Sequence, residues 1–283
     1  MRLFVFASAF VTFTLCSCSA IGTKQAAVPQ DVLARSVHAN AQIENVRMQV
    51  NLQYELTGQT QEKGQLQFAA NTASWFQSLS GSGSMSRRVQ KSNGLSTIAA
   101  TMDIAMETPA LWYVRYNTAS FDLANDALNA TPFLRTWWKM TDADTNSAEQ
   151  ETFVQTPDPT IITAILESVV VDRDDGIVTE GNEKLYHYYV HIDAAALGET
   201  AASLPQAPMG EVWIDAETFL LKRAIWSLAD IPTKTGHIST SMDIRLSHQN
   251  EQLPLLLPIE SRNATSEVWR MFHTILPSAL LPE

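Results

Sequence analysis

The chain has 283 residues, of which 19 are basic and 30 acidic, and its formal net charge is −11. This acidic balance argues against nucleic acid as a partner and against electrostatic adhesion to anionic lipid. There are two cysteines, Cys16 and Cys18, both near the N-terminus. A domain beginning after them cannot form a disulfide, so its fold must rest on a hydrophobic core, for which about 265 residues suffice.

The N-terminus has the pattern of an export signal. Arg2 precedes an apolar run from Leu3 to Leu15, which has the length of a signal-peptide core and is short for a membrane-spanning helix. The run ends in Leu15-Cys16-Ser17-Cys18, which matches the lipobox of bacterial lipoproteins. We therefore expect lipid on Cys18 and anchoring at the extracytoplasmic face of a membrane in the cell envelope. The alternative is an ordinary cleaved signal with two incidental cysteines.

The first half of the chain predicts one helix followed by strands. Apolar residues at helical spacing predict a helix over Asp31 to Ile43, with Asp31 as its cap. A period of two begins at Val46 and predicts strands rather than helices. Strands are expected over Val46 to Leu56, around Leu66 to Phe68, and over Met85 to Lys91, Ile98 to Met106 and Leu111 to Tyr116. Turns are expected over Gly58 to Gly64, at Gly81-Ser82-Gly83-Ser84, and at Asn93-Gly94, a hairpin signal.

The second half returns to the strand pattern after a less regular region. Short helices are expected within Asp122 to Thr136, over Pro159 to Val169 and over Ser266 to Leu276, and a turn at Asp174-Asp175-Gly176. Strands are expected over Trp137 to Met140, Tyr186 to Asp193, Glu211 to Asp215, Leu220 to Leu228 and Ile238 to Ser247. We assign 1–17 to the signal peptide, 18–30 to the lipidated tether, 31–262 to a lipid-binding domain and 263–283 to a C-terminal extension.

Nine or ten amphipathic strands and two or three short helices predict the architecture. So few helices cannot cover so many apolar strand faces unless the sheet curves upon itself. We expect an α+β fold: a curved, half-open antiparallel β-barrel with a few short helices as a lid over a hydrophobic cavity. A well-packed barrel core would give the same sequence pattern, so the cavity itself is a hypothesis.

Several segments of the chain have a recognisable pattern: Leu185 to Asp193, Glu211 to Asp215 with Leu220 to Arg223, and Asp243 to Ser247, preceded by Trp112-Tyr113 and Trp138-Lys139. These segments resemble the bacterial lipoprotein-localisation and lipid-carrier superfamily, with its LolA-like fold, and especially its actinobacterial-type lipoprotein branch. The resemblance is strong only over Tyr186 to Ser247. It implies the half-barrel fold and a lipid or acyl chain as ligand, and it supplies no catalytic motif.

Motifs for catalysis and metal binding are absent or incomplete. No nucleophile elbow, phosphate loop or zinc-protease motif occurs. His187 and His191 lie about 13 Å apart on one strand face, too far to share a metal, and we interpret them as facing solvent. Asp142 and Asp172 each begin an incomplete imitation of a calcium loop. We predict no enzyme activity, cofactor or metal.

The candidate binding site is the set of apolar residues expected to point inward. They are Met48, Val50, Leu52, Tyr54, Phe68, Ile98, Met102, Ile104, Tyr188, Val212, Ile214, Met242 and Ile244. Plain core is the alternative for each, although the recurring methionines suit a pocket for variable acyl chains. The leading hypothesis is a lipid- or acyl-chain-binding lipoprotein for lipid or lipoprotein transport. A second is an envelope-stress sensor or assembly factor that binds a protein partner with the same fold.

Overall fold

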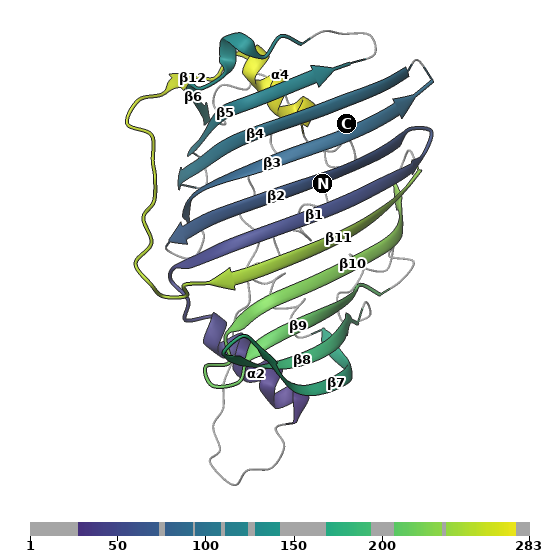
Figure 1. Ribbon diagram of the computed structural model, residues 1–283, viewed down its shortest axis with the longest axis vertical. Helices are drawn as coiled ribbons and strands as arrows, with labels where there is room; N and C mark the ends of the chain where they lie inside the picture. The colour runs from purple at the N-terminus through teal and green to yellow at the C-terminus, as the bar shows by residue number, and fades with distance from the viewer. Residues whose placement is uncertain are drawn as a thin grey trace.

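The computed structural model describes residues 28–73, 77–92, 94–108, 111–123, 128–141, 168–193, 207–233 and 236–275. Within these residues twelve strands form one sheet, accompanied by two α-helices and one 3-10 turn (Figure 1). The elements are α2 (Pro29–Asn40), β1 (Val46–Gly58), β2 (Gln61–Ala73), β3 (Ser78–Lys91), β4 (Gly94–Thr108), β5 (Leu111–Asp122), η1 (Thr131–Phe133), β6 (Trp137–Thr141), β7 (Val169–Glu180), β8 (Glu183–Ile192), β9 (Met209–Asp215), β10 (Leu221–Thr233), β11 (Gly236–Ser247), β12 (Arg262–Asn263) and α4 (Ser266–Ile275).

The sheet consists of two meanders that meet in its centre. Its order is β12-β6-β5-β4-β3-β2-β1-β11-β10-β9-β8-β7, so β1 pairs with β11 although they are far apart in sequence. Every named pairing is antiparallel except that of the two-residue β12 with β6. The chain therefore runs outward from β1 to one edge, resumes at the other edge with β7, and returns to β1 with β11.

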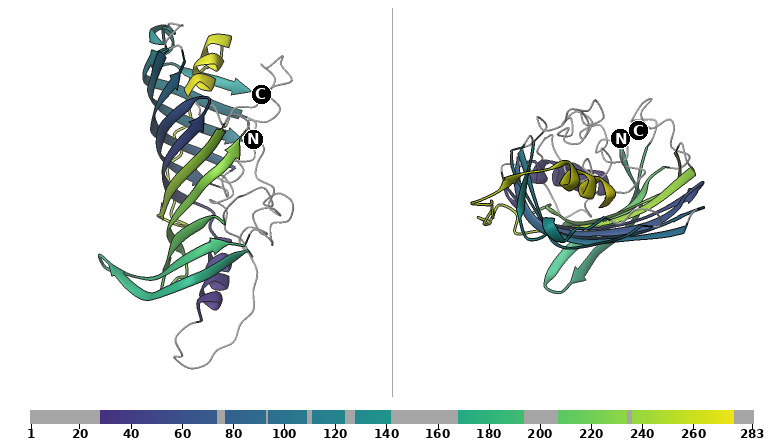
Figure 2. Two further views of the ribbon diagram at one scale, coloured as in Figure 1. Left: turned by 90° about the vertical axis from the view of Figure 1, so that its right-hand side faces the viewer. Right: turned by 90° about the horizontal axis from the view of Figure 1, so that it is seen from above.

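The sheet is strongly curved, and both α-helices lie on its concave side (Figure 2). Helix α2 contacts β7, near one edge, and α4 contacts β3 and β4, toward the other. The edges do not pair with each other, so the barrel is half open. The expected fold, a curved half-open antiparallel barrel with short helices over its concave face, is confirmed. Neither described helix is long and apolar enough to cross a membrane.

Alternation of side chains holds the sheet in register. Along β1, Val46, Met48, Tyr54 and Leu56 are buried, whereas Arg47 and its alternate neighbours are mostly exposed. A slip of one residue would turn this apolar set to the other face, so burial of one face specifies the pairing. Helix α2 is joined to β10 through buried Asn40, whose Oδ1 accepts a hydrogen bond from the Leu221 N–H at 3.3 Å.

Two expected turns were wrong, and one turn and one helix have other bounds than expected. Residues 81–84 lie inside β3, and residues 174–176 form an irregularity within β7, whose hairpin turn comes after Glu180. The turn expected over 58–64 comprises only residues 59 and 60, because β1 ends at Gly58 and β2 begins at Gln61. Glycine suggested turns, but Gly81 and Gly83 lie where neighbouring strands leave no room for a side chain. Helix α2 begins at Pro29 rather than Asp31. The helix expected over 159–169 lies outside the described residues up to 167, and β7 begins at Val169.

We expect Gly81→Ala to destabilise the sheet. A Cβ at position 81 would lie 2.7 Å from the Ala70 Cβ and would collide with the backbone oxygen of Ala69. The strands must separate to accept it, which we expect to reduce the free energy of unfolding by about 1–3 kcal/mol. Urea unfolding measures this, with Ser84→Ala, on the opposite face of the same strand, as the control. Equal midpoints for both variants would contradict the tight approach of β2 and β3.

Candidate functional site

All thirteen candidate residues lie on the concave face. The register places Val50 between Ile244 and Phe68, and Leu52 between Met242 and Leu66. The row of Val50 and Phe68 continues through Gly83 to Met102, and a neighbouring row runs from Met48 and Ala70 through Gly81 to Ile104. On the other side of β11, Tyr188 pairs with Val212, and Ile214 follows two residues later. The period of two in the sequence thus translates into one continuous apolar face.

Nine of these thirteen side chains are buried within two packed clusters. One cluster joins α2 to β1 and β7–β11, and it contains Val32 and Leu33 of the helix. The other joins α4 to the far ends of β1–β6 and contains Val268, Met271 and Ile275 of that helix. The nine buried candidates are Met48, Tyr54, Ile98, Met102, Tyr188, Val212, Ile214, Met242 and Ile244. These residues form the core of the domain, whatever else they contact.

The other four candidates are only partly buried and lie between the clusters. Val50, Leu52 and Phe68 pack against the α2 cluster, and Ile104 packs against the α4 cluster together with Leu66. The face is shallow here because inward positions carry small residues: Gly81, Gly83, Ala70 and Ala100. Among the described residues, the centre of the concave face is therefore apolar and accessible in part.

A buried charged cluster closes one end of this face and was missed from the sequence. The Tyr54 hydroxyl donates to Glu62 Oε1 at 2.7 Å, and Arg87 Nη1 donates to the same oxygen at 3.3 Å. Glu62 is 1% exposed, so its charge must be compensated by these donors. The Tyr54 ring lies directly over Gly64, and a side chain there would collide with it. In the sequence, Glu62 falls on the same alternate positions as the inward residues Leu66 and Phe68. A strand predicted to begin at Gln61 would therefore have placed Glu62 on the concave face.

Tyrosine hydroxyls are buried on the concave side rather than placed at an exposed rim. Burial, followed by the negative charge of Glu62, raises the pKa of Tyr54 well above its usual range. Burial likewise raises the pKa of Tyr116 and of Tyr188. The hydroxyls of Tyr116 and Tyr188 have no hydrogen-bond partner among the described residues. Each is a buried polar atom that a ligand oxygen could satisfy, one in each apolar cluster.

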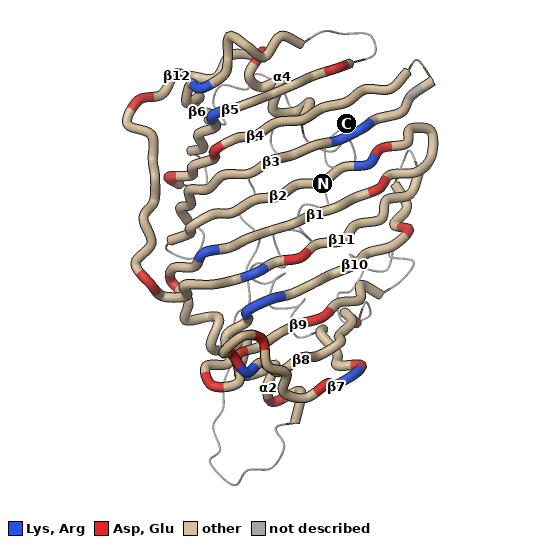
Figure 3. Tube along the Cα trace, viewed as in Figure 1, with Lys and Arg blue, Asp and Glu red and all other residues tan. Residues whose placement is uncertain are grey.

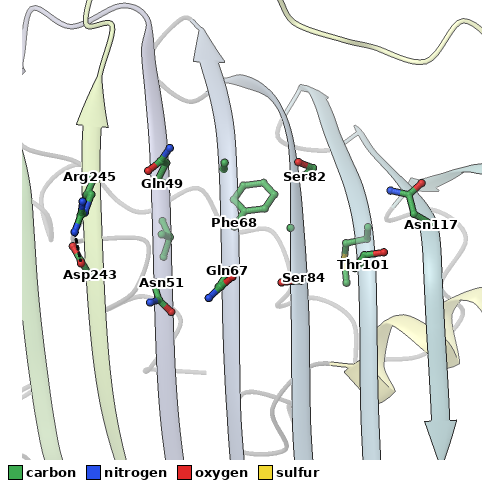
Figure 4. Close-up of a pocket in the computed structure, with 14 residues that line it drawn as sticks. Gln49, Asn51, Gln67, Phe68, Ser82, Ser84, Thr101, Asn117, Asp243 and Arg245 are labelled. Carbon is green, nitrogen blue, oxygen red and sulfur yellow. Dashed lines mark ion pairs between the residues drawn. The ribbon is translucent and has the colours of Figure 1, made fainter.

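The convex face is different in chemistry. A groove of about 540 Å³ crosses β11 and β1–β5, lined by amide and hydroxyl side chains that include Gln49, Asn51 and Ser84 (Figure 4). At its margin Arg223 donates to both oxygens of Asp243, at 2.9 and 2.8 Å. Burial opposes ionisation of Asp243, but the arginine hydrogen bonds outweigh it and hold its pKa below the usual range. Lys, Arg, Asp and Glu are interspersed over this view of the sheet, without a patch of one sign (Figure 3).

His187 does not face solvent as expected. It is 8% exposed and stacks on Trp213, with 4.4 Å between ring centroids, while its Nε2 lies 3.0 Å from Glu211 Oε2. The aromatic and ionic neighbours on β9 cover it, which a single-strand pattern could not reveal. His191 is partly exposed and pairs with Asp172. Among the described residues no group of three potential ligands could hold a metal ion. Cys18 and Asp142 lie outside the described residues.

The described residues form a half-open, curved antiparallel barrel with an apolar concave face, which is the fold that the sequence resemblance implied. No family model and no curated protein sequence matches the chain. Among solved structures it is similar to lipoprotein LppX of Mycobacterium tuberculosis, at 14% identity and a TM-score of 0.38, over 81% of this chain and 100% of that one. It is similar to LprF from Mycobacterium bovis, at 12% identity and a TM-score of 0.40, over 81% and 96%.

A third similar structure is a β-barrel-like protein of a domain of unknown function from Brucella abortus, at 7% identity and a TM-score of 0.27. It covers 72% of this chain and 98% of that chain. All three likenesses are distant in sequence and in superposition. Ligand and mechanism must therefore be argued from the residues of this chain.

We expect Glu62→Gln to destabilise the domain strongly, because it removes the charge of the buried carboxylate that accepts hydrogen bonds from Tyr54 and Arg87. Breaking a buried pair from one side costs about 3–5 kcal/mol, whereas an exposed pair contributes less than about 1 kcal/mol. The exposed pair Glu55–Lys63, at 2.8 Å on the same hairpin, supplies the control variant Glu55→Gln. Urea unfolding of both variants distinguishes the two environments. Indistinguishable losses would show that the Glu62 charge is screened by water.

Proposed function

We propose that this protein is an envelope lipoprotein, anchored by lipid on Cys18, that binds the acyl chains of a lipid on the concave face of its sheet. The observation that carries the proposal is the partly exposed apolar centre formed by Val50, Leu52, Phe68 and Ile104. If this face served only as part of the core, we would expect large side chains from the sheet and from the covering elements to fill it at the density of a protein interior. On β3, the inward positions of this centre are Gly81 and Gly83, which contribute no side chain of their own.

The physical basis for binding is burial of alkyl chain. Each CH₂ moved from water onto an apolar surface contributes about 0.8 kcal/mol, so one long chain supplies useful affinity without any charge pair. Met102 and Met242 border the centre on either side and can adapt to chains of different shape. The buried hydroxyls of Tyr116 and Tyr188 could bind an ester or hydroxyl oxygen of the ligand. The proposal needs no catalytic residue and assigns none.

Transport of the bound lipid or lipoprotein across the envelope would follow from the same arrangement. The bound chain would lie on a face that is open at two unpaired edges, so it could enter and leave without unfolding of the sheet. Two or three acyl chains at the N-terminus would hold the protein stably on the membrane from which it collects its ligand.

Native mass spectrometry of the mature protein purified from a bacterial envelope, followed by lipid extraction, tests the proposal. We expect one lipid at near-stoichiometric amount, and a mass for the N-terminal peptide that includes acyl groups on Cys18. A protein that carries no lipid and takes up neither phospholipid nor glycolipid would contradict the carrier function. That result would favour a sensor or assembly factor with a protein partner.

A variant pair locates the bound lipid. We expect Leu52→Gln to reduce lipid retention at least tenfold, because it places an amide on the apolar centre, whose desolvation costs about 1–3 kcal/mol. Gln53→Ala, one residue along and on the convex face, should leave retention unchanged. Lipid content per protein, measured by mass spectrometry at equal folded fraction, is the readout. Equal losses in the two variants, or none in either, would place the ligand elsewhere.

A further inference from the structure

The connection between β11 and β12 exposes an unusual run of apolar side chains. Residues 251–261, here called the strap, run along the rim formed by the ends of β1–β5, with neither helix nor strand (Figure 1). Leu256 is 73% exposed, Leu257 40% and Ile259 101%. The other exposed large apolar residues of the described chain are Val28, Leu95, Val170, Ile177 and Met209, which lie apart from one another in the sequence. Three exposed apolar side chains within four residues indicate that another molecule covers this surface.

The strap is held in place with these side chains outward. The Asn71 Nδ2 donates to the Pro254 carbonyl at 3.0 Å, and the Leu256 N–H donates to Ser80 Oγ at 2.9 Å. At its start the Asn250 N–H donates to the Asn45 carbonyl at 2.7 Å, and Asn250 Oδ1 accepts from the Glu44 N–H at 2.8 Å. Because strands β2 and β3 fix the backbone of the strap, exposure of the leucines is a property of the fold.

We infer that the strap docks on a lipid bilayer and inserts Leu256, Leu257 and Ile259 into its interfacial region. Insertion requires that few backbone groups lose water without a partner. In the strap Pro254 and Pro258 carry no N–H and the Leu256 N–H is already bonded to Ser80, which reduces the number of backbone donors that would lose water. The exposed side chains project separately from a narrow segment. A fluid bilayer can accept such side chains because its lipids rearrange around them, whereas a folded protein would need a surface of matching shape.

The position of the strap agrees with anchoring through Cys18, and to this extent the inference rests on the proposed function. Nine residues lie between Cys18 and Val28, so these ten steps of the chain allow the lipidated end to lie at most about 36 Å from the start of α2. Helix α2 spans about 18 Å, and residues 44 and 45, just after it, are bonded to the start of the strap. The anchor and the strap can therefore rest on the same membrane surface.

Charge selects the kind of bilayer. Glu251 and Glu260 lie in the strap, both are exposed, and the whole chain has a net charge of −11. Anionic headgroups would repel this rim within a Debye length, whereas zwitterionic headgroups would not. The structure assigns the strap to a bilayer whose surface is zwitterionic, with apolar insertion rather than electrostatic attraction as the source of affinity.

Depth-dependent fluorescence quenching tests this inference. The mature chain keeps only Cys18, which is acylated, so Leu256→Cys provides a single reactive thiol for a fluorophore. Leu95→Cys, 53% exposed at the start of β4 on the opposite rim, is the matched control. The lipoproteins are reconstituted in phosphatidylcholine vesicles that contain nitroxide-labelled lipid. We expect several-fold stronger quenching at position 256 than at position 95, and weaker quenching when phosphatidylglycerol replaces part of the phosphatidylcholine at low salt.

The outcomes separate the strap from the lipid site and from other occupants. Equal quenching at both positions in protein that floats with the vesicles would overturn the inference. A label at position 256 that lipid nitroxides do not reach, but that is shielded from iodide in native envelope membranes, would assign the strap to a protein and overturn it as well. Shielding that depends on protein concentration would assign it to a second copy. Leu52→Gln should lose bound lipid yet keep the quenching at 256, so the two proposals fail independently.

Discussion

The fold depends on one constraint: a twelve-stranded sheet of alternating strands must remove one of its two faces from water. The unpaired edges at β7 and at β12 show that the sheet does not solve this by closing. It curves instead, so that its apolar face becomes concave, and two short helices cover the two ends of that face. Because each helix packs into its own cluster, the described helices contact the two ends of the face rather than its middle. The candidate site is a consequence of this arrangement.

Small inward residues are as important to the site as the large ones. Gly64 allows the Tyr54 ring to lie across the neighbouring strand, and Gly83 does the same for Phe68, whose Cδ2 would be 2.9 Å from an added Cβ. An aromatic ring that leans over a glycine packs against the backbone of the sheet. The ring then projects little above the sheet, so the surface beside it stays shallow. The concave surface therefore contains both firmly packed rings and a shallow apolar centre.

The polar groups are divided between the two faces in a way that matches these roles. On the convex face the contact of Arg223 with Asp243 is partly exposed, with 25% and 24% of the two side chains accessible, so solvent weakens its contribution to stability. On the concave face one ionic cluster, Glu62 with Arg87 and Tyr54, is buried at an end of the sheet. A buried charged cluster fixes a unique arrangement at that end while leaving the centre purely apolar. The strap adds an exposed apolar rim outside both faces.

The sequence by itself determined which residues share a face, because the period of two is a local property of strands. For this reason the alternate residues from Met48 to Tyr54, and Met242 with Ile244, were assigned to one face correctly. It also determined the scarcity of helices and hence the open, curved sheet. It could not distinguish core from accessible surface among the thirteen candidates, since that depends on where α2 and α4 pack. It misread Gly81 and Gly83 as a turn, because a glycine required by a neighbouring strand looks like a glycine required by a bend. Glu62 and His187 were missed or misplaced, since their burial comes from partners on other strands. These features are set by contacts between distant segments, and only the tertiary structure decided them.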